Sequence, residues 1–250
     1  MAERAGTEKA AGANPFVGMV KPTSQASGSH DALTKLLPAR VRTHTVYCGI
    51  KDGTVEEFET VMPQYEKGVA EVAALGVDMI HPEGTPPFML KGYDGERRIV
   101  DKWQAAYGRP VFTSGQNQIR AMKALGAKRI VGAGYDSITG PTVERYFRDA
   151  GFEVIAIEKV KATWEEVGLL TDEAMIAMMA DVFRRHPGGQ LMYLQGSKWP
   201  SLNVVERLEA RIGVPVVQAV AARCWEIQIR CGLKEPVKGY GRLLAELPEG

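Results

Sequence analysis

Two stretches of similar sequence predict the fold of this chain: Met79-Ile-His-Pro-Glu-Gly-Thr-Pro-Pro-Phe-Met-Leu90 and Leu191-Met-Tyr-Leu-Gln-Gly-Ser-Lys-Trp-Pro-Ser-Leu202. Each begins with a short apolar run typical of a buried strand, and each then breaks at a glycine next to small hydroxyl residues and proline. A strand that ends in such a turn places backbone N–H groups and hydroxyls at the carboxyl edge of a sheet, where open α/β folds bind ligands. The two stretches therefore predict one cleft, with a turn from each half of the chain.

Length and composition are those of a globular protein. A chain of 250 residues can bury a sizeable core as one large domain or two small ones. The net charge of +1 gives no reason to expect nucleic acid or an anionic membrane as a partner. The sequence contains no apolar run of about 18 residues, and residues 1–10 lack the apolar core of a signal peptide. We expect a disordered tail over residues 1–14 and a cytoplasmic protein, with a homo-oligomer left open.

Cysteine usage and the spacing of metal-ligating residues indicate neither disulfides nor a metal. Cys48, Cys224 and Cys231 are too few and too scattered for a disulfide framework or a zinc site. No cluster of His, Asp and Glu has the spacing of metal ligands. We therefore expect a protein that needs no metal and no cofactor.

Short apolar runs alternate with helical patterns along the chain, which predicts parallel sheets joined by crossover helices. Thr54 opens one such helix as its N-cap, and this helix is expected to continue to Gly76. Residues 110–113 are expected to form a strand. Tyr107-Gly-Arg-Pro-Val-Phe112 matches Ile212-Gly-Val-Pro-Val-Val217, so the chain is interpreted as a duplicated α/β unit.

The turns after the two apolar runs are the strongest candidates for a binding site. Gly84-Thr85 and Gln195-Gly196-Ser197 are expected to form a nest of backbone N–H groups and hydroxyls for an oxyanion or a carboxylate. The alternative is that both turns simply end strands, as turn chemistry often requires. Because the pattern occurs twice at equivalent places, we favour the functional interpretation.

Four further polar residues are candidates for acid–base chemistry at the same edge. The Tyr135 hydroxyl would donate to a developing enolate, and Lys21 would bind a carboxylate or serve as an acid. His81 and Glu83 point to the same side of their strand by alternation, which allows a paired acid–base role. The alternatives are ordinary loop residues for Tyr135 and Lys21, and a local hydrogen bond for His81.

Other residues are expected to complete the cleft. Ser114 follows a predicted strand and opens a helix, so it either helps to cradle an anion or belongs to a plain helix cap. Four apolar side chains are expected to form the walls of the cleft: Phe88, Met89, Trp164 and Trp199.

With these residues, the chain resembles the aspartate/glutamate/hydantoin racemase superfamily and is most similar to its arylmalonate decarboxylase and maleate cis-trans isomerase branch. The likeness extends from Gly18 to Leu243. Its most specific parts are Gly84-Thr85, Ala124-Leu-Gly-Ala-Lys-Arg-Ile130, Tyr135, Arg211-Ile-Gly-Val-Pro-Val-Val217 and Gly239-Tyr-Gly-Arg-Leu243.

This resemblance implies an α/β fold with two pseudo-symmetric, Rossmann-like domains, parallel sheets, and the active site in the cleft between the domains. We place the first domain at residues 15–118 plus 218–250, and the second at residues 119–217.

The resemblance also implies catalytic cysteines, and this chain lacks them. Members of the superfamily use one cysteine after the equivalent strand in each half, and arylmalonate decarboxylase keeps only the second. Here the first position is Gly84 and the second is Gln195, whose amide does not titrate near neutral pH and cannot replace a thiol. Pro86 stands where the decarboxylase has a hydroxyl residue in its dioxyanion-binding loop, and proline supplies neither a hydroxyl nor an N–H.

We therefore expect a cofactor-independent lyase that acts on a small carboxylic acid, by decarboxylation or a related enolate-forming cleavage. The alternatives are an isomerase or racemase with acid–base groups other than cysteine, and a small-carboxylate binding protein without catalysis. The substrate carboxylate would be held by a nest of Thr85, Tyr135, Gln195 and Gly196, with Ser197 as a further donor. The candidates for the proton donor or acceptor are Lys21, His81, Glu83 and Lys198.

Overall fold

The structure is a computed structural model that describes residues 14–24, 28–135, 137–162 and 166–250, without the side chains of residues 28–31. The predicted disordered tail therefore lies, apart from Asn14, outside the described residues. No helix in these ranges is both long and apolar enough to cross a membrane.

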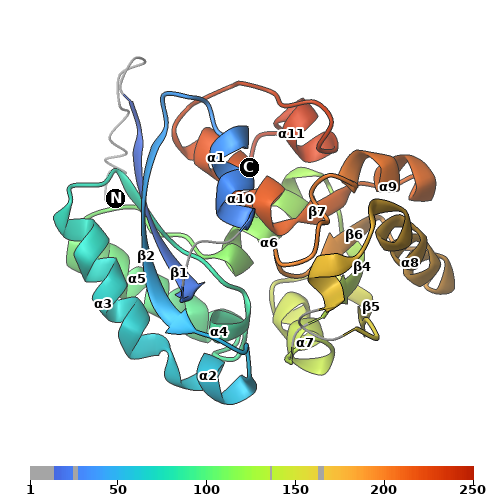
Figure 1. Cartoon of the computed structure of the whole chain (residues 1–250), viewed down its shortest axis with the longest axis horizontal. Helices are drawn as coiled ribbons and strands as arrows, with labels where there is room; N and C mark the ends of the chain where they lie inside the picture. The colour runs from blue at the N-terminus through green and yellow to red at the C-terminus, as the bar shows by residue number, and fades with distance from the viewer. Residues whose placement is uncertain (1–13, 25–27, 136, 163–165) are drawn as a thin grey trace, which may run out of the picture.

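The first half of the chain forms a parallel sheet of three strands in the order β2–β1–β3 (Figure 1). The strands are β1 (Phe16–Thr23), β2 (Arg42–Ile50) and β3 (Met79–Pro82). The predicted strand at residues 110–113 is wrong, because only Val111 pairs with the sheet, through a single bridge to Ile80. Pro110 has no N–H to donate to a neighbouring strand, and Thr113 already turns the chain into a helix by capping it.

The second half forms a parallel sheet of four strands in the order β5–β4–β6–β7. The strands are β4 (Arg129–Gly134), β5 (Glu153–Lys159), β6 (Leu191–Leu194) and β7 (Val216–Gln218). The order is that of the first sheet, with β7 in the place of Val111, so the two halves repeat one arrangement. The predicted α/β fold with parallel sheets is confirmed. The domain boundaries remain a prediction.

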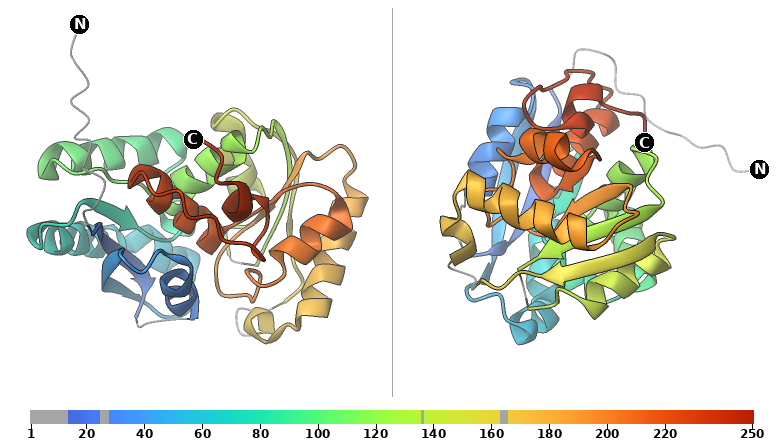
Figure 2. Two further views of the ribbon diagram at one scale, coloured as in Figure 1. Left: turned by 90° about the horizontal axis from the view of Figure 1, so that it is seen from above. Right: turned by 90° about the vertical axis from the view of Figure 1, so that its right-hand side faces the viewer.

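Helices join the strands and flank the sheets, and the two halves lie side by side (Figure 2). The helices are α1 (Gly28–Leu36), α2 (Val55–Thr60), α3 (Met62–Ala74), α4 (Pro86–Met89), α5 (Tyr93–Tyr107), α6 (Ser114–Ala124), α7 (Pro141–Asp149), α8 (Asp172–Arg185), α9 (Val205–Ile212), α10 (Ala219–Arg230) and α11 (Arg242–Glu246), with a 3₁₀ turn at Glu166–Leu169. Helix α10 packs against both α1 and α6.

The prediction of a single helix from Thr54 to Gly76 is wrong, because the structure has two helices there, α2 and α3. Thr54 does cap α2, and with Glu57 it forms the predicted capping box. The helical path then breaks at Val61, which is the N-cap of α3. The cause is Pro63 in the first turn of α3, because proline cannot donate the backbone hydrogen bond that a continuous helix requires.

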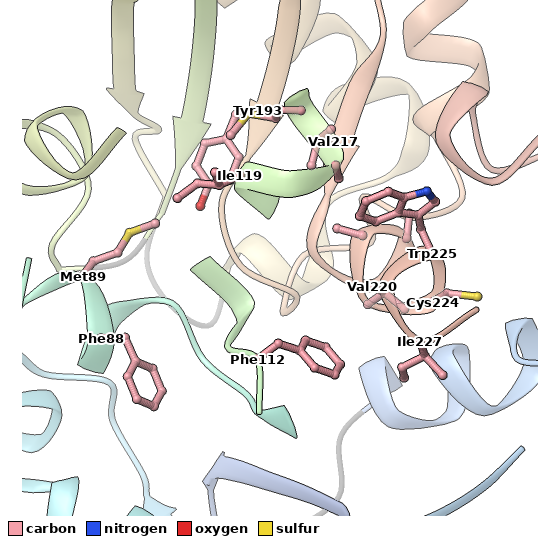
Figure 3. Packing of buried hydrophobic residues seen from close by; sticks show 14 of the residues in the cluster. Phe88, Met89, Phe112, Ile119, Tyr193, Val217, Val220, Cys224, Trp225 and Ile227 are labelled. Carbon is pink, nitrogen blue, oxygen red and sulfur yellow. The ribbon is translucent and has the colours of Figure 1, made fainter. Parts of the chain in front are cut away.

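The main hydrophobic core continues from one half of the molecule to the other. Alternate residues of β6 face opposite sides of its sheet: Leu191 and Tyr193 join the main core, whereas Met192 and Leu194 join a smaller one under α8 and α9. Figure 3 shows part of the main core, where residues of the second sheet meet residues of α10 and of the first half; those labelled include Tyr193, Val217, Val220, Trp225, Phe112 and Phe88.

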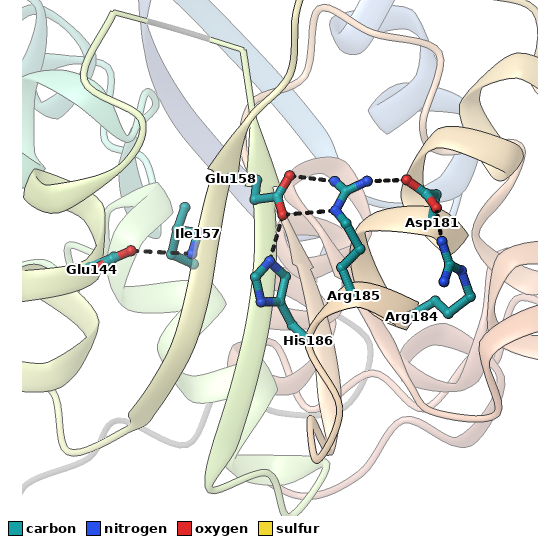
Figure 4. A network of polar contacts seen from close by, with 7 residues as sticks. All are labelled: Glu144, Ile157, Glu158, Asp181, Arg184, Arg185 and His186. Atoms are coloured by element: carbon teal, nitrogen blue, oxygen red, sulfur yellow. Dashed lines mark hydrogen bonds and ion pairs between the residues drawn. The ribbon is translucent and has the colours of Figure 1, made fainter.

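A surface network of charges ties the end of α8 to β5 (Figure 4). Glu158 pairs with Arg185 at 2.5 Å and with the ring of His186 at 2.5 Å, and Arg185 also reaches Asp181. These side chains are partly exposed, and exposed ion pairs contribute only about 1 kcal/mol or less each. The network supports the second sheet but lies outside the cavity described next.

Candidate active site

A cavity of about 530 Å³ is lined by residues from both halves of the chain. Its wall combines the carboxyl ends of β1 and β3, the first turns of α6 and α10, and the turns that follow β4 and β6. The predicted site residues that line it are Lys21, Glu83, Gly84, Thr85, Pro86, Ser114, Tyr135, Gly196, Ser197, Lys198 and Trp199. The structure thus places both predicted turns in one cavity.

The first turn is held open by Gly84 and anchored by Ser114. The Gly84 N–H donates to the Ser114 hydroxyl at 3.0 Å. Gly84 has φ +102°, and a Cβ there would lie only 2.9 Å from the hydroxyl oxygen of Tyr65. A larger side chain, including a cysteine, therefore does not fit at this position without displacement. Thr85 is buried and lines the cavity, and its hydroxyl makes no capping hydrogen bond to α4.

The second turn packs directly on Tyr135. The Tyr135 hydroxyl accepts a hydrogen bond from the Lys198 N–H at 2.8 Å, and its ring meets Trp199 edge to face at 4.9 Å. Within the described part of the chain, the N–H groups of Gly196 and Ser197 donate to no protein acceptor. Two backbone donors and the tyrosine hydroxyl therefore meet at one wall of the cavity.

Two predicted site residues, His81 and Gln195, are buried but do not line the cavity. The His81 ring stacks on Phe112, and its Nδ1–H donates to the Phe112 carbonyl oxygen at 2.7 Å, so the predicted pairing with Glu83 as acid and base is not formed. The Gln195 side-chain oxygen accepts from the Thr139 hydroxyl at 3.1 Å. The side-chain oxygen of Gln195 is thus bound by Thr139, and Gln195 does not join the other residues of the predicted nest on the cavity wall.

The predicted apolar walls are only partly correct. Phe88 and Met89 are buried in the main core and do not line the cavity. The Phe88 ring packs edge to face on Tyr65 and on Trp103 instead. Trp199 does line the cavity, and Trp164 lies outside the described residues.

A buried group of three charges forms another part of the wall. Glu83 binds Arg223 through one carboxylate oxygen at 2.8 Å and the Lys21 ammonium through the other at 3.4 Å. Burial would raise the pKa of Glu83, but the positive charges of Arg223 and Lys21 hold it below the ordinary value, so the group is ionised. The sequence analysis missed Arg223. Its signal was a charged residue within an otherwise apolar stretch of helix, Ala219–Cys224.

Helix α10 begins at the cavity wall, and Gln218 fixes its first turn. The Gln218 side-chain oxygen accepts from the N–H groups of Val220 at 2.7 Å and Ala221 at 3.1 Å, and its amide donates to the Ser201 hydroxyl at 3.1 Å. This cap connects α10 to the segment that follows β6 and sets the position of Arg223 one turn later. Gln218 was also missed by the sequence analysis.

The described wall of the cavity is strongly positive. Four cationic side chains and one carboxylate line it, which makes a formal excess of three positive charges: Lys21, Lys51, Lys198 and Arg223 against Glu83. An anionic ligand would be attracted by this field. Among the described residues, no group of three or more His, Cys, Asp or Glu side chains is placed to hold a metal ion.

A family model described as arylmalonate decarboxylase matches residues 17–244. The chain belongs to the arylmalonate decarboxylase family. The resemblance predicted from the sequence is thus confirmed, and with it the assignment of the chain to a family of enzymes. Members and structural neighbours of the arylmalonate decarboxylase family decarboxylate or isomerise small carboxylates, and this coarse description of the activity is supported here.

Individual relatives of the arylmalonate decarboxylase family are distant in sequence. The chain is 20% identical to arylmalonate decarboxylase of Bordetella bronchiseptica over 79% of its own length and 84% of that protein. A liganded two-position variant of arylmalonate decarboxylase is 19% identical, with a TM-score of 0.82 over 93% of this chain and 99% of that one. The maleate isomerase Iso of Pseudomonas putida S16 is 23% identical, with a TM-score of 0.81 over the same shares of the two chains. The solved structures establish the fold.

No sulfur-containing residue lines the cavity wall as described. None of the three cysteines of the chain therefore belongs to this wall. Cys224 is buried, its thiol contacts the Leu36 carbonyl oxygen at 3.5 Å, and burial raises its pKa to about 12. Burial likewise raises the pKa of Cys48 to about 12. Neither thiol is activated as a nucleophile, because the reactive form is the thiolate.

A buried carboxyl behind α6 gives a first testable prediction. Glu96 accepts hydrogen bonds from the hydroxyls of Thr113, at 2.6 Å, and Tyr146. Burial raises the pKa of Glu96 to about 7, and these two hydrogen bonds only partly oppose the rise. Because the folded pKa lies above the ordinary 4.5, the folded state should lose about 3 kcal/mol of stability as the pH rises from about 4.5 to about 7.

Glu96→Gln should remove this loss, so that the variant gains stability relative to the wild type as the pH rises through that window. Urea unfolding at several pH values measures the difference. Glu66→Gln, at an exposed glutamate on α3, is the matched control and should show no such trend. A constant difference between Glu96→Gln and the wild type at all pH values would contradict the prediction.

Proposed function

We propose that this protein is a decarboxylase of small substituted malonic acids that uses no thiol. The observation that carries the proposal is the convergence of the Thr85 hydroxyl, the Tyr135 hydroxyl and the N–H groups of Gly196 and Ser197 on one cavity with an excess of positive charge. Such donors bind a carboxylate in the ground state and bind the enediolate, which carries more charge on the same oxygens, more strongly.

In the proposed reaction, the retained carboxylate binds to these donors. The C–C bond to the second carboxylate breaks, carbon dioxide leaves, and the electron pair stays on the α-carbon, delocalised into the retained carboxylate as an enediolate. The α-carbon then takes up one proton. Preplaced donors need no reorganisation as this charge develops, and each donor contributes about 3 kcal/mol.

Decarboxylation is favoured over isomerisation by the absence of cysteine from the described cavity wall. Isomerisation by addition to a double bond requires a nucleophile that forms and breaks a bond to carbon. Among the residues whose side chains the structure describes, no histidine lies on the wall beside the hydroxyls of Thr85 and Ser197, and His81 is turned to Phe112. Decarboxylation requires only charge stabilisation and a proton, which this wall supplies.

The test is a panel of phenylmalonate, methylmalonate and maleate incubated with the purified protein, with products identified by NMR. We expect carbon dioxide and the monoacid from at least one malonate. Thr85→Val and Tyr135→Phe should each lower kcat/KM by about 10²–10³, the usual cost of one lost oxyanion donor. Thr60→Val, at an exposed threonine on α2, is the matched control and should leave kcat/KM unchanged.

Three results would count against the proposal. Unchanged turnover in both Thr85→Val and Tyr135→Phe would mean that the nest takes no part in the reaction. Conversion of maleate to fumarate without any decarboxylation would make the protein an isomerase. Binding of phenylmalonate with no product after long incubation would make it a binding protein.

A further inference from the structure

Arg223 is a buried charge on the cavity wall whose donors are only partly paired. It lies on α10 with 1% of its surface exposed, and its Nη2 binds the Glu83 carboxylate at 2.8 Å. Within the described structure, its Nε and Nη1 atoms are buried and have no hydrogen-bond partner. Because a guanidinium has five N–H bonds, the bond on Nε and both bonds on Nη1 lack an acceptor.

Unpaired donors of this kind are unfavourable, because a buried polar group without a partner has lost its hydrogen bonds to water. The amides of Asn117 and Gln118 are also buried without partners, but they are neutral and do not line the cavity as described. Arg223 differs from them in carrying a permanent positive charge at the cavity wall. An anionic group on a ligand in the cavity would supply the acceptor that the Arg223 donors lack.

Pairing with Glu83 does not by itself explain an arginine at this position. Glu83 is also contacted by the Lys21 ammonium at 3.4 Å, so its charge does not depend on Arg223 alone. The contact with Glu83 is made by Nη2. The remaining donors of the guanidinium are suited to a second carboxylate, because its planar fork matches the two oxygens of that group.

The chemistry of decarboxylation restricts which carboxylate of a substrate Arg223 can usefully bind. The retained carboxylate belongs to the nest of Thr85, Tyr135, Gly196 and Ser197. The departing carboxylate becomes neutral carbon dioxide, so an arginine bound to it would stabilise the substrate more than the transition state and slow the reaction. A carboxylate on the substituent of the α-carbon keeps its charge throughout, and binding it increases affinity without opposing the chemistry.

The geometry points to Arg223 as a specificity-determining residue that binds a carboxylate on the substituent of the substrate, an inference that rests on the proposed decarboxylation. The substrate class is then a malonic acid with a third carboxylate, such as carboxymethylmalonate. The bond from the α-carbon to one malonate carboxylate breaks, its electron pair stays on the α-carbon as carbon dioxide leaves, and the α-carbon takes up one proton that comes ultimately from water. The products of carboxymethylmalonate are carbon dioxide and succinate.

The first measurement compares two substrates in the wild-type protein. Carboxymethylmalonate and ethylmalonate differ chiefly in whether the substituent ends in a carboxylate or in a methyl group. We expect kcat/KM to be about 10–100-fold higher for carboxymethylmalonate, the usual effect of hydrogen bonds between charged groups. Calorimetry should show a similar preference for succinate over butyrate, the two products. Equal or better turnover of ethylmalonate, without a preference for succinate, would overturn the role of Arg223 and leave the proposed decarboxylation intact.

The second measurement uses Arg223→Gln, which removes the charge but keeps an amide that can donate to Glu83; circular dichroism and urea unfolding would verify its fold. We expect kcat/KM to fall by about 10–100-fold for carboxymethylmalonate and to change little for ethylmalonate. Arg223→Lys keeps the positive charge beside Glu83 and should retain part of the preference. The matched control is Arg40→Gln, at an exposed arginine that pairs with Glu235 outside the cavity, and it should leave both values unchanged.

An equal loss for both substrates in Arg223→Gln would overturn the inference, because Arg223 would then act on the nest or on the departing carboxylate. A preference that is lost in Lys51→Met but kept in Arg223→Gln would also overturn it, since the exposed lysine on the same wall would then hold the third carboxylate. A wild-type protein that releases no carbon dioxide from any malonate would overturn the proposed function itself. The binding of succinate and butyrate to the wild type and to Arg223→Gln would still test Arg223 separately.

Discussion

Gly196→Ala is expected to lower kcat/KM for decarboxylation by about 10³ or more. Gly196 has φ +84°, a left-handed conformation that costs an alanine roughly 1–3 kcal/mol where the surroundings enforce it. Its added Cβ would also lie 2.7 Å from Cζ of the Tyr135 ring, closer than van der Waals contact allows. Either the turn or the tyrosine must move.

Both movements disrupt the nest. The Tyr135 hydroxyl would leave its hydrogen bond with the Lys198 N–H, and the ring would be pushed towards Trp199, which it already contacts. A displaced turn would misdirect the Gly196 N–H itself. Losing one donor costs about 3–4 kcal/mol in the transition state, and partial loss of two accounts for the expected effect.

Gly213→Ala is the matched control for Gly196→Ala. Gly213 ends α9 with φ +78°, and nothing lies within 4 Å of a Cβ placed there, so the substitution carries the conformational cost without a clash. We expect it to lower the free energy of unfolding by about 1 kcal/mol and to leave kcat/KM unchanged. Steady-state kinetics and urea unfolding of both variants decide the point, and full activity in Gly196→Ala would contradict the arrangement of the nest described here.

The wild-type protein is expected to lose about 5 kcal/mol of stability through His81 alone as the pH falls from about 6.5 to about 3. Burial, followed by the charge of Arg223, lowers the pKa of His81 from 6.5 to about 3. Between these two pKa values His81 therefore stays neutral in the folded state and is protonated in the unfolded chain. Stability from this group is fully present above the unfolded pKa and is lost as the pH falls towards the folded pKa.

The geometry explains why His81 stays neutral. Its Nδ1–H donates to the Phe112 carbonyl oxygen, and within the described structure Nε2 has no hydrogen-bond partner. A second proton at Nε2 would create a buried cation near Arg223 with nothing to accept its hydrogen bond. His81→Asn keeps a donor for the Phe112 carbonyl oxygen but cannot be protonated.

The difference in unfolding free energy between the wild type and His81→Asn should therefore shift by about 3 kcal/mol, in favour of the variant, between about pH 6.5 and about pH 4. Taking this difference cancels the contribution of the carboxylates to the pH dependence, because they titrate in both proteins. His44→Asn, at an exposed histidine on β2, should show no comparable shift. A difference that stays constant with pH would mean that folding does not lower the pKa of His81.

Local signals in the sequence were sufficient to predict the architecture and most of the candidate residues that line the cavity. An apolar run followed by Gly-Thr or Gly-Ser predicts a buried strand that ends in an open turn, because only glycine adopts the positive φ found at Gly84 and Gly196 without strain. In parallel sheets such turns gather at one edge, which brought Thr85 and Ser197 into one cavity. The capping box at Thr54 was predictable for the same reason, since it involves neighbouring residues only.

The predicted orientation was not found for buried polar side chains whose hydrogen-bond partners are distant in the sequence. His81 and Gln195 follow buried strands as the pattern indicated, yet their polar groups bind Phe112 and Thr139 rather than facing the cavity. A buried polar group takes whichever hydrogen-bond partner the packing offers. Those partners lie 31 and 56 positions away, so the sequence near each residue carries no information about them.

The sequence by itself determined the repeated α/β arrangement, the two glycine turns and the absence of cysteine from both family positions. Only the tertiary structure decided that Lys21 and Arg223 share one carboxylate, Glu83, at the cavity wall. The physical reason is that secondary structure follows from interactions between neighbours, whereas the pairing of buried charges depends on how helix α10, late in the chain, packs against strands formed at its beginning. A charge within an apolar helix indicates that a partner must exist, and the fold identifies that partner.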